Sequence, residues 1–137
     1  MCAHLTILVV DDDAAIRAML RRILEPAGYQ ILEAADGLAA LEQIEAERPD
    51  LILLDMIMPR LDGWGVLRAL QQSPPLATIP VVLVSGHILA EDSQVRAWGA
   101  VAQLPKPFRP TALRALVAEL LTPGEQPVYS TQSTGRD

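Results

Sequence analysis

The sequence predicts an α/β fold, a doubly wound five-stranded parallel sheet with helices on both faces. Short apolar runs rich in Val, Ile and Leu, bounded by acids, Gly or Pro, recur along the chain, and this pattern is typical of strands buried on both faces. Segments with helical spacing of apolar residues separate the runs. Because parallel strands need crossover connections, the alternation of strand and helix favours a parallel sheet.

Five segments are predicted as strands. Continuous apolar runs at residues 5–10, 51–54 and 80–84 give three of them, and residues 30–34 and 101–104 give two weaker ones.

The first helix is marked by an apolar stripe at steps of three and four, formed by Ile16, Leu20, Ile23 and Leu24. Asp13 can cap its start, and Pro26 and Gly28 end it. Similar stripes predict a second helix behind Asp36 and a third around Leu67. A fourth is expected over residues 89–98, and a fifth over residues 110–121, with Pro110 in its first turn.

Composition predicts one soluble domain. The chain has 137 residues, 50% hydrophobic and 20% charged, and we expect one domain over residues 1–121 followed by a polar tail over residues 122–137. A single cysteine, Cys2, excludes an internal disulfide and favours a reducing compartment. No apolar run reaches the roughly 18 residues that span a bilayer, and the N-terminus lacks a secretory signal, so we expect a cytoplasmic protein without membrane contact. A net charge of −6 argues against direct nucleic-acid binding.

Polar side chains follow four of the predicted strands: Asp11 and Asp12 the first, Asp55 the third, Ser85 the fourth and Lys106 the fifth. The carboxyl ends of parallel strands meet at one edge of a sheet, so these groups should converge. Three carboxylates and one ammonium leave a charge of −2, which should attract a hard divalent cation such as Mg2+. A pocket so neutralised suits a phosphoryl group, with Asp55 best placed to attack phosphorus.

Four motifs carry a family resemblance when they are taken together in order. They are Ile7-Leu8-Val9-Val10-Asp11-Asp12, then Leu53-Leu54-Asp55 with Met58-Pro59 and Asp62-Gly63, then Val84-Ser85-Gly86, and finally Lys106-Pro107-Phe108. Over about residues 5–121 the chain resembles a receiver domain of bacterial two-component response regulators, similar to the single-domain chemotaxis type. The resemblance implies a flavodoxin-like sheet of order 2-1-3-4-5.

The resemblance also implies roles for the site residues. Asp55 would be the phosphoacceptor, and Asp11, Asp12 and Asp55 would hold Mg2+ together with the backbone carbonyl of Ile57. Ser85 would be the switch hydroxyl, and Lys106 would pair with the phosphoryl group. The peptide bond between Lys106 and the following proline is usually cis in this family.

The function implied is that of a phosphoacceptor in a two-component phosphorelay. A histidine kinase or histidine phosphotransfer protein would donate the phosphoryl group, and catalysis would be limited to self-phosphotransfer and autodephosphorylation. Because no second domain follows Leu121, we expect output through protein contacts on the fourth helix, fifth strand and fifth helix.

Two other functions stay open. A small-molecule magnesium phosphatase or phosphotransferase also begins from a strand-end aspartate, but it would normally have an acid two residues after the nucleophile, where this chain has Ile57. A degenerate receiver that binds partners without phosphorylation also stays open because of Gln103, since the family usually has Tyr or Phe there. We expect Gln103 to be exposed and the conformational switch to be weaker. Pro105 also departs from the pattern, since it removes an amide from the strand end.

Surface residues of the predicted helices could serve packing or partner binding. Arg17, Arg21 and Arg22 form a basic edge on the first helix that fits either a solvated face or partner docking. In relatives the neighbourhood of Met19 meets the histidine-bearing partner. Trp64 and Trp98 are expected to serve packing rather than ligand stacking.

Overall fold

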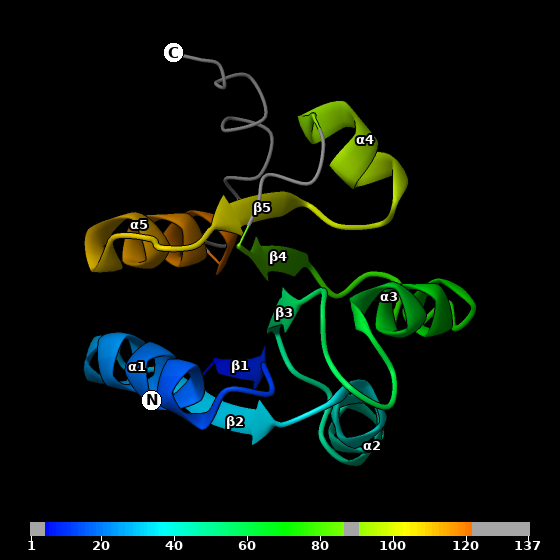
Figure 1. The fold of residues 1–137 in the computed structure, drawn as a ribbon, viewed down its shortest axis with the longest axis horizontal. Helices are drawn as coiled ribbons and strands as arrows, with labels where there is room; N and C mark the ends of the chain where they lie inside the picture. The colour runs from blue at the N-terminus through cyan, green and yellow to red at the C-terminus, as the bar shows by residue number, and fades with distance from the viewer. Residues whose placement is uncertain (1–4, 87–90, 122–137) are drawn as a thin grey trace. The chain divides into compact units, whose positions relative to one another are not determined.

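The fold is a five-stranded parallel sheet of order β2-β1-β3-β4-β5 (Figure 1). A computed structural model describes residues 5–86 and 91–121. The strands are β1 (Thr6–Val10), β2 (Gln30–Ala34), β3 (Leu51–Asp55), β4 (Val81–Ser85) and β5 (Ala102–Pro105). The predicted fold class and strand order are therefore confirmed.

The chain divides into two compact units, Met1–Pro107 and Phe108–Asp137. The first holds the whole sheet together with α1 (Ala14–Leu24), the short 3-10 helix η1 (Glu25–Ala27), α2 (Gly37–Ala46), α3 (Gly63–Gln71) and α4 (Asp92–Ala97). In the second unit the described residues include α5 (Pro110–Leu121). All groups of the candidate site lie in the first unit.

In the first unit α1 covers one face of the sheet, and α2 and α3 cover the other (Figure 1). Strands β1, β3 and β4 are buried at every position, which explains their nearly unbroken apolar sequences. Alternate residues such as Leu8 and Ile52 join a core cluster with Ile44 of α2 and Val66 of α3. The burial of both faces fixes the register of the strands and hence where each strand ends.

An aspartate caps each of the first three helices where the chain leaves the sheet. The side chains of Asp13, Asp36 and Asp62 accept hydrogen bonds from backbone amides in the first turns of α1, α2 and α3. Asp13 was the expected cap of α1. The caps set the direction in which each helix departs from the carboxyl edge of the sheet.

The fourth helix is shorter than its sequence pattern predicts. It begins at Asp92 and ends at Ala97, whereas residues 89–98 were expected; residues 87–90 lie outside the described part of the chain. Trp98 forms its C-cap, and Gly99 follows with a φ of 100°, so glycine's tolerance of positive φ ends the helix. The rings of Trp98 and Trp64 of α3 meet edge to face, with centroids 4.5 Å apart and planes at 88°. These tryptophans serve packing, as expected.

Candidate functional site

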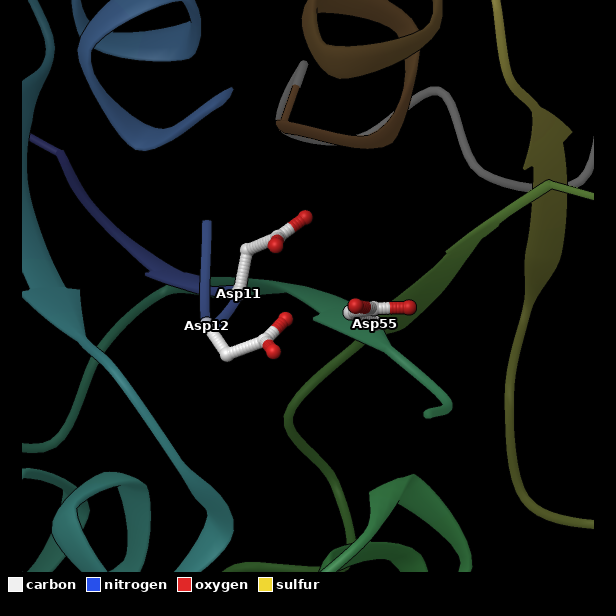
Figure 2. A group of neighbouring side chains, drawn as sticks. All are labelled: Asp11, Asp12 and Asp55. Atoms are coloured by element: carbon white, nitrogen blue, oxygen red, sulfur yellow. The ribbon is translucent and has the colours of Figure 1, made fainter. Parts of the chain in front are cut away.

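Three carboxylates converge at the carboxyl edge of the sheet (Figure 2). Asp11 and Asp12 follow β1, and Asp55 is the last residue of β3, the neighbouring strand. One oxygen from each of the three lies within 4.8 Å of the others. Asp11 is 2% exposed and Asp55 8% exposed, whereas Asp12 is exposed to solvent. The cluster predicted from the strand ends is thus present.

Lys106 brings positive charge to this cluster. Its Nζ donates a hydrogen bond to Oδ2 of Asp11 at 2.9 Å and lies 3.9 Å from Oδ2 of Asp55. The peptide bond between Lys106 and Pro107 is cis, as the resemblance implied. Lys106 is the single lysine in the sequence, and every other basic side chain apart from the two histidines is an arginine.

Ser85 ends β4 beside the same edge. It is 4% exposed, and its carbonyl oxygen accepts a hydrogen bond from the amide of Lys106 at 2.6 Å. Ser85 is the register partner of Pro105, so strand pairing persists to the last residue of β5. Pro105 is accommodated because β5 lies at the sheet edge, where a missing amide is tolerated.

The surroundings of Asp55 place its pKa above the ordinary value of an aspartate. Burial raises the pKa of its carboxyl group, and the nearby negative charge of Asp11 raises it further. The ammonium of Lys106 and a hydrogen bond from the Ile57 amide, at 3.4 Å, act in the opposite direction. A cation bound beside these carboxylates would offset the repulsion between Asp55 and Asp11.

The loop after Asp55 is anchored to the start of α2, and the sequence reading missed this. The amide of Gly37 donates to the carbonyl oxygen of Leu61 at 3.0 Å, and Nε of Arg60 lies 3.2 Å from Oδ2 of Asp36. Arg60 has a φ of 71°, a left-handed conformation unusual for a non-glycine residue. These contacts hold the loop that carries Ile57 against a fixed element.

The donor set fits a hard divalent cation. Three carboxylates offer oxygen ligands that lie close together, and Mg2+ binds through one or two carboxylates while it keeps several waters. The exposure of Asp12 leaves room for such waters. The side chain of Ile57 is 76% exposed, and the role of its carbonyl stays a prediction.

The burial of Gln103 differs from what the sequence predicted. It lies in β5 as the register partner of Leu83, and it is partly buried rather than exposed. A mid-strand position beside a buried β4 residue explains why only part of the side chain reaches solvent.

The fold and the acidic edge together define an α/β domain of the receiver class. The family model for the response regulator receiver domain matches residues 7–118. The chain therefore belongs to the receiver domain family of two-component response regulators.

Curated relatives and solved structures agree with this family assignment. The chain is 39% identical over 129 residues to a probable transcriptional regulator, ycf27, of Cyanophora paradoxa, covering 93% of this chain and 53% of that protein. It is 44% identical over 114 residues to response regulator MprA of Mycobacterium ulcerans, covering 83% and 47%. The chain thus spans about half the length of these curated relatives.

Among solved structures, chemotaxis protein CheY4 of Vibrio cholerae superposes with a TM-score of 0.80 at 32% identity, covering 87% of this chain and all of that one. The receiver domain of a Pseudomonas aeruginosa sensor histidine kinase superposes with a TM-score of 0.76 at 27% identity, covering 85% of this chain and 96% of that one. In that structure a magnesium ion is coordinated in the active-site cleft. Within the described residues of the present chain, no helix has the length and apolar character needed to cross a bilayer.

Proposed function

We propose that this receiver domain accepts a phosphoryl group on Asp55 from a histidine kinase or a histidine phosphotransfer protein, with Mg2+ as cofactor. The observation that carries the proposal is the convergence of Asp11, Asp12 and Asp55 within 4.8 Å, with Nζ of Lys106 bonded to Asp11 and 3.9 Å from Asp55.

Transfer requires Asp55 as a carboxylate. One of its oxygens forms a bond to phosphorus while the bond from phosphorus to the donor imidazole breaks, and the imidazole nitrogen keeps the electron pair. Lys106 would pair with a phosphoryl oxygen, and the Ser85 hydroxyl would donate a hydrogen bond to another. Attack by water on the acyl phosphate later restores Asp55 and releases inorganic phosphate.

Asp11, Asp12 and Asp55 would hold Mg2+, with the Ile57 carbonyl as a further ligand. When bound, the cation neutralises the charge on the transferring phosphoryl oxygens. It would also favour the ionised form of Asp55, opposing the burial that raises the pKa of this carboxyl group. The magnesium-bound neighbour from Pseudomonas aeruginosa supports this assignment.

We propose that the output passes through protein contacts in the cytoplasm. The net charge of −6 supports a protein partner over direct contact with nucleic acid, and the single cysteine fits a reducing compartment. The surface expected over the fourth helix, fifth strand and fifth helix stays a prediction.

Labelling by acetyl phosphate, read by intact mass, tests the proposal. Wild-type protein should gain one phosphoryl group in Mg2+ and none in EDTA, and Asp55→Asn should gain none. Asp12→Ala should lose both labelling and Mg2+ affinity. The matched control is Asp13→Ala, because Asp13 is adjacent but belongs to the cap of α1 and not to the carboxylate cluster.

Two outcomes would contradict the proposal. Stoichiometric labelling of Asp55→Asn would move the nucleophile elsewhere. A wild-type protein that takes no phosphoryl group in Mg2+ would favour the degenerate receiver, a module that binds partners without phosphorylation.

A further inference from the structure

Asp11 is held from several directions at once. Its amide donates to the carbonyl oxygen of Ala34 at 3.1 Å, which continues the pairing of β1 with β2 past the end of the strand. Its Oδ1 accepts from the amide of Asp13 and its Oδ2 from Lys106, each at 2.9 Å. Its carbonyl oxygen accepts a hydrogen bond from Nη1 of Arg17 at 2.6 Å. Of these four hydrogen bonds, only the one from Arg17 joins a side chain to the backbone of Asp11.

Arg17 is itself fixed by an ionic network. Its Nε lies 3.0 Å from Oε1 of Glu33 on β2, and Oε2 of Glu33 lies 2.7 Å from Nε of Arg21. Arg21 also pairs with Glu25 at 2.6 Å. The Arg17 side chain is only 16% exposed, so neither a solvated face nor a free docking patch describes it. Its planar guanidinium spans an acid on β2 and a carbonyl at the end of β1.

The bonded carbonyl belongs to the peptide group that joins Asp11 to Asp12. A peptide group is planar and rigid, so fixing its oxygen also fixes the direction in which the chain enters Asp12. Asp12 is exposed, whereas Asp11 and Asp55 are buried among their neighbours. The direction of the Asp12 side chain therefore depends strongly on the peptide group before it.

We propose that Arg17 is a positioning residue of the acidic pocket, which fixes the peptide between Asp11 and Asp12 so that Asp12 faces the cation site before a cation arrives. The proposal rests on the proposed function, in which Asp12 helps to hold Mg2+. Charge-assisted hydrogen bonds are the strong ones, and residues that orient metal ligands typically change metal affinity by tenfold or more when they are removed.

Arg21 supplies a matched control. It lies one turn further along α1 and pairs with the same Glu33, but its remaining contacts are with Glu25 and the carbonyl oxygen of Ile31. Replacing either arginine removes an ion pair to Glu33, and only Arg17 contacts the Asp11 peptide.

The first test measures Mg2+ affinity by titration calorimetry on folded protein. Arg17→Met should weaken binding by about tenfold, whereas Arg21→Met should leave it unchanged. Equal affinity in Arg17→Met and wild type would overturn the inference and leave the proposed function intact. Absence of Mg2+ binding to wild-type protein would instead overturn the proposed function.

The second test needs no metal. In EDTA, hydrogen exchange at the amides of Asp12 and Asp13 should be faster in Arg17→Met than in wild type and unchanged in Arg21→Met. A brace that only joins α1 to β2 would change global stability in both variants without this local difference. Should Arg17→Met fail to fold, Arg17→Lys keeps the charge but lacks the planar fork, and wild-type affinity in that variant would equally overturn the inference.

Discussion

The ammonium of Lys106 lies 2.9 Å from Oδ2 of Asp11, although 95 positions separate the two residues in the sequence. Their strands are not neighbours, because β3 and β4 lie between β1 and β5. The pair therefore closes the acidic edge across the sheet and gives the buried carboxylate of Asp11 its counterion.

Replacing Lys106 should separate phosphorylation from signalling. Lys106→Ala removes the ammonium group that pairs with Asp11, a residue only 2% exposed. We therefore expect metal-free protein to lose about 1 to 3 kcal/mol of unfolding free energy. Some labelling by acetyl phosphate should persist, because Asp55 and the other proposed cation ligands remain, but the coupling to the output surface should be lost. Urea unfolding in EDTA, intact mass and partner binding measure the three effects. Wild-type partner binding by labelled Lys106→Ala would contradict the role in coupling.

Asp55→Asn should stabilise the metal-free fold at neutral pH. Because the pKa of Asp55 is raised in the folded state, folding is opposed once the carboxyl group ionises, and stability falls as pH rises from the ordinary aspartate pKa through the raised one. Asparagine cannot ionise, so the variant should gain most over wild type at neutral pH. The gain should vanish below the ordinary aspartate pKa, where both side chains are neutral. Urea unfolding in EDTA across this pH range measures the difference, and a difference independent of pH would contradict the assignment.

The sheet and its acidic edge were predictable because both follow from local sequence patterns, namely short apolar runs and the polar residues that come directly after them. Runs such as residues 51–54 bury every side chain, so apolar continuity identified β3 and placed Asp55 at its end. Once the strands were parallel, their shared carboxyl edge brought Asp55 to Asp11 and Lys106 without further information.

The contacts that the sequence did not reveal join residues from different elements. Such pairs leave no regular spacing in the sequence by which they could be recognised. The bond from Arg17 to the Asp11 carbonyl and the pair between Arg60 and Asp36 depend on how a helix and a loop are placed on the sheet. The predicted fourth helix is too long because apolar spacing in the sequence starts before Asp92, where α4 begins.

Gly37→Ala should disturb the loop after Asp55. A Cβ at position 37 would overlap the carbonyl oxygen of Leu61, a backbone atom that cannot turn away. We expect a loss of about 1 to 3 kcal/mol in unfolding free energy. The control is Gly86→Ala, because an added Cβ there meets no described atom within 4 Å. Equal stability of the two variants would contradict this close approach.

Met19→Glu should slow transfer from the cognate kinase but leave labelling by acetyl phosphate unchanged. Met19 is 37% exposed on α1, whose first turn begins beside the acidic edge, and a glutamate there adds charge to the surface expected to meet the donor. Leu38→Glu is the control, since Leu38 is 45% exposed on α2, across the sheet. Equal slowing of both phosphoryl donors by Met19→Glu would mean that this patch is structural.

Gln103 should limit the conformational response. The serine hydroxyl can still bond a phosphoryl oxygen, but the aromatic movement of relatives has no counterpart at this position, so the difference between the two states is smaller. Hydrogen exchange with and without beryllofluoride should show changes mainly near Ser85 and the start of α4, and Gln103→Tyr should extend them. A large change through β5 and α5 in wild-type protein would show that the switch needs no aromatic residue.

The edge-to-face pair of Trp64 and Trp98 gives this protein a built-in optical reporter. The sequence has two tryptophans, and both belong to this contact between α3 and the end of α4. Tryptophan fluorescence therefore arises from a single place in the fold. Any motion that separates these helices can be followed in the unmodified protein, without an attached dye.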